Sequence, residues 1–226
     1  MRVWIILCSF LLCTTSVALA VQPSESKQTL VMGNEKEKVY LYATPNEKED
    51  LYTDFHVKIG NQVVETQGWE VSMSETRLPE LHIVDLNHDG KKEIVVIITI
   101  GTGTWVVMKQ AHILQEVETS VGRAYAEMDI DNPVHTIERD FTITATNKMI
   151  KVKGRGHEWK AANACGKTYY HHRFPLYQYV NWRVEGNKLM ADVGLTITHN
   201  CVPAGFLLTY EQKGEIYIAK KIKVNL

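Results

Sequence analysis

This chain has little of what most functional signatures are built from. Only 4 cysteines and 6 prolines occur among its 226 residues, and 25 basic residues nearly balance 26 acidic ones. A near-neutral chain lacks the basic excess that phosphate backbones require, so nucleic acid is not expected as a partner. No apolar run beyond the first twenty residues is long enough to cross a bilayer, so no transmembrane segment is expected after removal of a signal peptide.

Signatures of catalysis are also scarce. No serine stands in a Gly-x-Ser-x-Gly elbow, and the glycine-rich run 101–104 lacks the lysine and the following helix of a phosphate-binding loop. His157-Glu158 begins like a zinc-protease motif, but Ala161 stands where the second histidine belongs. The absence of an internal repeat argues against a complete propeller. The sequence therefore favours a non-enzymatic protein.

The N-terminus has the pattern of a secretory signal peptide. Arg2 precedes the apolar stretch Val3–Leu12, and Ala18-Leu19-Ala20 is a small-x-small cleavage site. We assign residues 1–20 to this signal, residues 21–38 to a flexible N-terminal arm, and residues 39–226 to a single β-rich domain. The protein is therefore expected to be secreted or held at the cell surface.

Two cysteines remain in the mature chain, Cys165 and Cys201. An even pair in an exported protein favours one disulfide. A Cys/His metal site is the alternative, because His199 precedes Cys201 by two residues and His171 and His172 follow Cys165.

Alternating apolar residues and turn signals predict a β-dominated fold. Hairpins are expected over 55–65, 142–152, 177–198 and 206–224, each with a polar or glycine-containing turn. The unbroken β-branched run 94–100 is typical of a strand buried on both faces. Asn132-Pro133 predicts the start of one short helix near 134–141, with Asp131 or Asn132 as its cap. Residues 116–131 and 154–170 are interpreted as loops. The expected architecture is all-β or β-dominated, with antiparallel hairpins forming a sandwich-like or two-sheet domain.

The run Asp85–Glu93 carries the clearest chemical signal. Oxygen-bearing side chains occupy its first, third, fifth and ninth positions, and Gly90 follows the third of them. Ca²⁺ takes six to eight oxygen ligands at loosely constrained angles, and a short loop of this kind supplies most of them. With three carboxylates, the affinity is expected in the weak extracellular range, on the order of 10⁻⁴–10⁻³ M.

The flanking residues are strand-like, unlike the helices of an EF-hand. The pattern Asp-x-Asn-x-Asp-Gly-x-x-Glu between strands resembles the calcium loop of FG-GAP/VCBS-type repeats. The wider stretch Leu81–Leu114 is similar to uncharacterised exported proteins of Gram-positive spore-forming bacteria that carry a single such loop. That resemblance implies a fold type and a cation, but no activity. The ligands it implies are side-chain oxygens of Asp85, Asn87 and Asp89, the backbone carbonyl of Lys91, and Glu93.

Three hypotheses of function follow. The first is a secreted or cell-surface, non-enzymatic protein with one structural Ca²⁺, serving a binding or scaffolding role at the cell envelope. The second is a zinc-dependent envelope hydrolase that uses His157 and Glu158 with His171 or His172. The third is a metal-free interaction module, in which Asp89-Gly90 is a tight turn and Asp85 and Asn87 bond nearby backbone amides.

Overall fold

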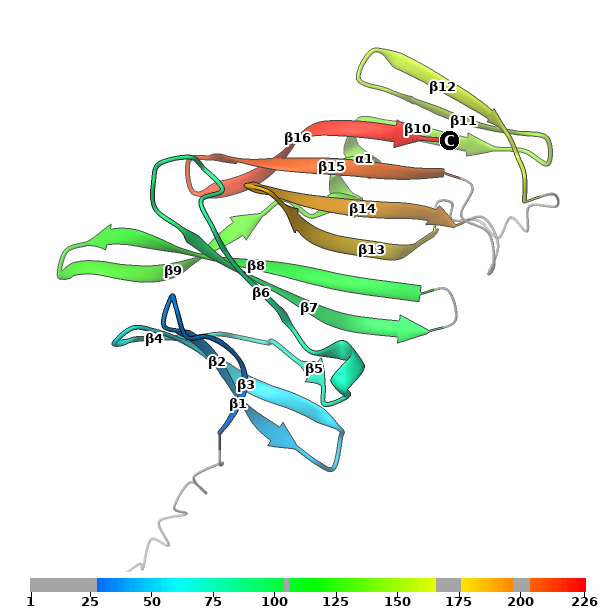
Figure 1. The fold of residues 1–226 in the computed structure, drawn as a ribbon. Helices are drawn as coiled ribbons and strands as arrows, with labels where there is room; N and C mark the ends of the chain where they lie inside the picture. Colours follow the sequence, from blue (N-terminus) through cyan, green and yellow to red (C-terminus); the bar gives the residue numbers. More distant parts are fainter. Residues whose placement is uncertain (1–27, 104–105, 166–175, 197–203) are drawn as a thin grey trace, which may run out of the picture.

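The computed structural model describes residues 28–103, 106–165, 176–196 and 204–226. These residues form three sheets and one short α-helix (Figure 1). Two sheets are fully antiparallel and the largest has two parallel pairings, so the predicted β-dominated class is confirmed. No helix among the described residues is long and apolar enough to span a membrane.

The strands group as follows. The first sheet contains β1 (Thr29–Asn34), β2 (Val39–Asn46), β3 (Leu51–Ile59), β4 (Gln62–Glu65) and β5 (Val71–Ser72). The 3-10 turn η1 (Glu75–Arg77) then leads into the second sheet. The second sheet contains β6 (Glu80–Val84), β7 (Glu93–Gly103), β8 (Val106–Thr119), β9 (Gly122–Ile130), β13 (Leu176–Glu185), β14 (Lys188–Thr196), β15 (Ala204–Lys213) and β16 (Ile216–Asn225). The third sheet contains β10 (Phe141–Ala145), β11 (Met149–Gly154) and β12 (His157–Ala162).

Strand β7 lies between the first sheet and β13–β16, and it is buried on both faces from Glu93 to Ile98, which confirms the prediction for most of the run 94–100; Ile100 is exposed. Ile94, Val96 and Ile98 pack in a hydrophobic core with the first sheet. Val95 and Ile97 point the other way, into a larger core shared with β13–β16 and the helix. Successive side chains of a strand point to opposite faces, so one strand supports two cores. Figure 1 shows the resulting order, with β6–β9 between the first sheet and β13–β16.

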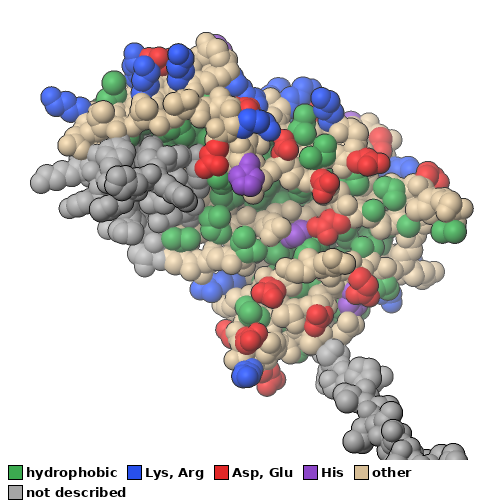
Figure 2. Space-filling view, turned by 180° about the vertical axis from the view of Figure 1, so that it is seen from behind, with side chains coloured by type: hydrophobic (Ala, Val, Ile, Leu, Met, Phe, Trp, Pro, Cys, Tyr) green, Lys and Arg blue, Asp and Glu red, His purple; other side chains and the backbone are tan. Residues whose placement is uncertain are grey.

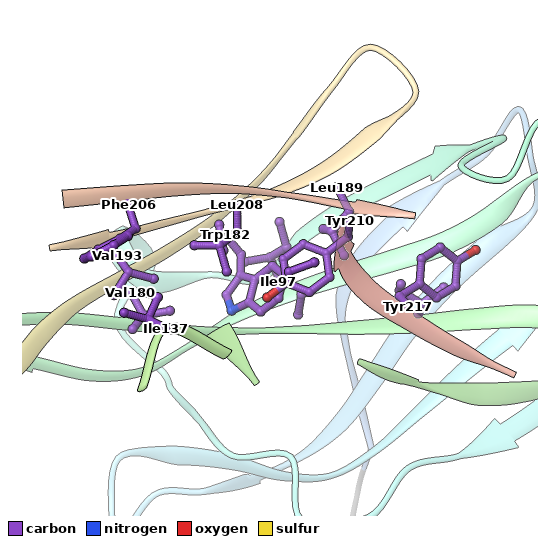
Figure 3. Close-up of a cluster of buried hydrophobic side chains, with 14 of the residues drawn as sticks. Ile97, Ile137, Val180, Trp182, Leu189, Val193, Phe206, Leu208, Tyr210 and Tyr217 are labelled. Carbon is purple, nitrogen blue, oxygen red and sulfur yellow. The ribbon is translucent and has the colours of Figure 1, made fainter. Parts of the chain in front are cut away.

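Two parallel contacts close part of the second sheet into a ring. β13 pairs with β8 through Tyr179 and Val107, and β16 pairs with β9 through Tyr217 and Ile130. The ring therefore runs β8-β9-β16-β15-β14-β13 and returns to β8. Side chains of these strands, together with Ile97 of β7 and Ile137 of α1, form the core cluster shown in Figure 3. Within it the rings of Trp182 and Tyr210 have centroids 4.9 Å apart.

The single helix, α1 (Pro133–Asp140), confirms the predicted short helix near 134–141. Asn132 caps its N-terminus, because its Oδ1 accepts hydrogen bonds from the backbone N–H groups of Val134 and His135. Proline occupies the first helical turn, where a missing N–H costs nothing. Ile137 is fully buried and joins α1 to the larger core.

Each predicted hairpin is present where the structure describes it: β3–β4, β10–β11, β13–β14 and β15–β16 are antiparallel neighbours in sequence and in space.

Three expectations about loops were wrong in part. β1 lies inside the predicted N-terminal arm and pairs with β2. The end of β8 and all of β9 occupy the predicted loop 116–131, and β12 lies inside the predicted loop 154–170. All three strands are defined by pairing with a neighbour rather than by a clear alternation of their own.

Candidate metal centre

The acidic loop joins two adjacent antiparallel strands. The last pair of the β6–β7 ladder is Val84 opposite Glu93, so the loop spans the eight residues between them. His88 and Gly90 have φ angles of 62° and 87°, in the left-handed region that a tight turn requires. Glycine adopts this conformation without steric cost, which explains Gly90 after the third ligand position.

Inside the loop, side-chain oxygens accept hydrogen bonds from loop amides. Asp85 accepts at Oδ1 from the N–H of Asp89 (3.2 Å) and at Oδ2 from that of Gly90 (3.1 Å). Asn87 Oδ1 also accepts from Asp89 N–H at 3.0 Å, and Asp89 Oδ1 accepts from Lys91 N–H at 2.7 Å. The backbone therefore curls around three of the predicted ligands and directs their oxygens into the loop. This is the bonding pattern of the metal-free turn hypothesis.

Glu93 differs from the other acids because it is buried. It is 1% exposed, and its Oε2 accepts a hydrogen bond from Leu86 N–H at 2.7 Å. Its Oε1 is buried and receives no hydrogen bond. Burial raises the pKa of the Glu93 carboxyl, and the negative charge of Asp89 acts in the same direction. A buried carboxylate oxygen without a donor is costly, because the desolvation of the charge is not offset.

Three residues outside the loop, on β8, β15 and β16, complete its surroundings. Asn87 Nδ2 donates to Gln212 Oε1 on β15 at 2.8 Å, and Gln212 Nε2 donates to Gln115 Oε1 on β8 at 2.9 Å. The Tyr217 hydroxyl on β16 is buried without a hydrogen-bond partner. Burial raises the pKa of the Tyr217 phenol, and the Glu93 charge adds to that shift. Nothing in the local sequence of the loop indicates these neighbours.

The donor set fits a hard, oxygen-binding cation by its chemistry. The Glu93 carboxylate has an oxygen without a donor, and the pKa of Glu93 is raised in part by Asp89 and Asp85. A cation among these carboxylates would lower the free energy of their ionised forms. Among the described residues, however, no three His, Cys, Asp or Glu side chains are arranged to hold an ion as they stand. Binding would therefore require the Asp85 and Asp89 side chains to exchange amide hydrogen bonds for metal contacts.

A cleft of about 530 Å³ adjoins the loop. Leu86, Asn87 and His88 form one wall, and the β13–β14 turn with β15 forms the other. Lys188 and Lys221 also line it, together with Glu185 and Glu211. Glu185 pairs with Arg183 and Glu211 pairs with Lys220, so the acidic charge on this wall is already balanced.

The described residues give little support to the hypothesis of a zinc site built from histidines. His157 and Glu158 are neighbours on β12, so their side chains point to opposite faces of the sheet. Glu158 bonds Lys160 at 2.6 Å and Lys151 at 3.1 Å, and these hydrogen bonds hold its pKa below the ordinary value. His171 and His172 lie outside the described residues.

Only one of the two cysteines of the predicted disulfide lies among the described residues. Cys165 lies at the end of the segment after β12 and packs against the larger core. Its backbone N–H donates to Asn163 Oδ1 at 3.0 Å. Cys201 lies outside the described residues, so the pairing of Cys165 with Cys201 stays a prediction.

Comparison with protein-family models, with curated proteins and with solved structures finds no match to this chain.

Proposed function

We propose that this chain is a secreted or cell-surface, non-catalytic protein whose Asp85–Glu93 loop binds one structural Ca²⁺. Its role would be binding or scaffolding at the cell envelope. The observation that supports the proposal is Glu93: a carboxylate at the last ligand position, 1% exposed, with one oxygen that no donor reaches. A simple surface turn has no need of a buried acid at this position.

The ion would supply positive charge and several coordination bonds to the carboxylates of Asp85, Asp89 and Glu93, whose charges already act on one another. The protein residues have distinct parts in this arrangement. Glu93 is fixed by strand β7 and by its bond from Leu86 N–H, so it forms the rigid side of the site. Asp85 and Asp89 form the other side, and their hydrogen bonds come only from within the loop: from backbone amides and, for Asp89, also from Asn87 Nδ2. Binding would pin the turn between β6 and β7, the strands that lie between the two cores.

Thermal denaturation tests this directly. The mature chain, residues 21–226, is freed of metal with a chelator and then melted across a calcium titration into the millimolar range. Calcium should raise the melting temperature by several degrees and magnesium should not, because Ca²⁺ accepts irregular oxygen geometry. Asp89→Ala should abolish the response, and Asp129→Ala, which removes an exposed acid from β9, should retain it.

The metal-free interaction module is the second candidate, and a specific observation favours it. Asp85, Asn87 and Asp89 already accept backbone hydrogen bonds that close the turn. It predicts identical melting curves with chelator, calcium and magnesium for both the parent chain and Asp89→Ala. That result would refute the calcium proposal. Stoichiometric zinc in protein purified without chelator would also count against the calcium proposal and would favour a zinc site built from the histidines.

A further inference from the structure

The solvent-facing side of the three-stranded sheet β10–β12 is basic. Ile150 and Val152 of β11 are fully buried against the larger core, so Lys151 and Lys153 between and beyond them point outward. Lys160 of β12 lies opposite Lys151 in the ladder, and Glu158 lies opposite Lys153. We call Lys151, Lys153 and Lys160 the basic face.

Two lysines of the basic face stand directly opposite each other. Like charges in this position destabilise a sheet. Glu158 relieves the repulsion in part, since it bonds both Lys151 and Lys160. Lys153 forms no ion pair with any described residue. The sheet therefore retains uncompensated positive charge that its own stability does not require.

Further basic residues surround the basic face, although Arg155 pairs with Asp140 and Lys220 pairs with Glu211. Residues 141–163 contain five basic residues and one acidic residue, a net charge of +4 with histidine neutral. Arg155, in the turn between β11 and β12, donates to the backbone oxygens of Ala219 and Lys220, which brings the exposed lysines of β16 alongside. Figure 2 shows Lys and Arg side chains gathered at the end of the molecule that β10–β12 form.

The opposite end carries the opposite charge. Residues 29–72, which include the whole first sheet, contain eight acidic and four basic residues, a net charge of −4. Figure 1 places the first sheet and β10–β12 at opposite ends of the stack of layers. A near-neutral chain is thus electrically polar, and an anionic surface would attract one end and repel the other.

We propose that the basic face docks on an anionic lipid surface by charge attraction. Lysine ammonium groups on flexible stems suit phosphate headgroups, which present no fixed pattern of acceptors. Met149, 40% exposed, stands at the end of β11 next to the basic face and offers an apolar group to the lipid boundary. The outward positions of these strands carry no aromatic side chain, whereas single-stranded nucleic acid is bound by aromatic stacking.

Vesicle co-sedimentation of the mature chain in chelator tests the docking independently of calcium. Vesicles contain 30 mol% phosphatidylglycerol in phosphatidylcholine, or phosphatidylcholine alone. Binding is expected only to the anionic vesicles and should be lost in 0.5 M salt, where screening shortens the reach of the charges. Equal binding to both kinds of vesicle would overturn the proposal.

Matched variants locate the surface. Lys151, Lys153 and Lys160 are changed together to Gln, and the control changes three exposed lysines of the acidic end, Lys36, Lys48 and Lys58, in the same way. The first variant should lose on the order of a hundredfold in partition coefficient, and the single change Lys153→Gln about fivefold. The control should change little.

Two further outcomes would overturn the proposal. An equal loss in the control variant would mean that net charge, and not this face, governs binding. Binding of soluble polyphosphate without binding of anionic vesicles would assign the basic face to a phosphate polymer instead of a lipid surface. Melting curves of all three variants verify that each is folded.

Discussion

The substitution Glu93→Gln separates the two possible states of the acidic loop. The amide oxygen of glutamine can accept the 2.7 Å hydrogen bond from Leu86 N–H that Oε2 accepts now. The substitution removes the negative charge, which burial disfavours, and it replaces the oxygen without a donor by an amide group. In chelator we therefore expect a change in unfolding free energy within about 1 kcal/mol, because the gain and the loss oppose each other.

With calcium the expectation is different. A dissociation constant on the order of 10⁻⁴–10⁻³ M gives the parent chain about 1.4–2.7 kcal/mol of additional stability at 10 mM calcium. For a chain of this size, that corresponds to a rise of roughly 3–10 °C in melting temperature. Glu93→Gln should remove most of this rise, because the neutral amide is a weaker ligand and the buried negative charge is gone.

The assay is differential scanning calorimetry of both chains in chelator and in 10 mM calcium. Glu65→Gln is the matched control, since Glu65 is an exposed acid on β4 outside the loop. It should show the full calcium response. A parent chain that responds to calcium together with a Glu93→Gln variant that responds equally would refute the assignment of Glu93 as a ligand. A large loss of stability in chelator would instead show that the charge of Glu93 supports the fold itself.

Three further predictions concern the fold around the site. Gly154→Ala should cost about 1–3 kcal/mol in a melting experiment, because the added Cβ would clash with the carbonyl oxygen of Asp140. Gly101→Ala is the control and should cost less, because its Cβ would make an ordinary 3.7 Å contact with Met108 Cβ. Asp140→Asn should cost about 1 kcal/mol at neutral pH, because hydrogen bonds from Arg139 at 2.8 Å and then from Arg155 at 2.6 Å hold the pKa of the Asp140 carboxyl below its ordinary value. In urea titrations the difference from the parent should vanish as the pH falls through that lowered pKa and the parent carboxyl protonates. Trp69→Ala should cost about 3–5 kcal/mol by chemical denaturation, because the side chain is 2% exposed in the core beneath the first sheet.

The pattern of residues predicted the elements whose signals are local. Turn residues marked the β3–β4 and β10–β11 hairpins, because glycine and asparagine favour tight turns wherever they occur. Asn132 and Pro133 marked the start of α1 for the same reason, since capping depends only on nearby amides. The run 94–100 predicted a strand buried on both faces. Residues 94–98 lie between two cores as predicted, whereas Ile100 is 52% exposed.

Strands without such signals were missed. β9 begins at a glycine and mixes polar with apolar residues, and it is held by β8 on one side and by β16 on the other. β12 is mostly exposed, only half of its residues are apolar, and it is ordered by its pairing with β11. β-strand formation depends on a partner, and the partner of a strand cannot be identified from that strand alone.

The sequence by itself determined the β class, the position of the turn at Asp85–Gly90 and the oxygen-rich character of the loop, since these depend on residue type and spacing within a few positions. Only the tertiary structure decided which of the acids is buried. Glu93 is enclosed because β7 lies between two cores, and the loop is joined to Gln212 and lies near Tyr217, more than a hundred residues away in the chain. It also decided that lysines scattered through residues 141–163 gather on one face, because pairing between strands fixes which side chains become neighbours.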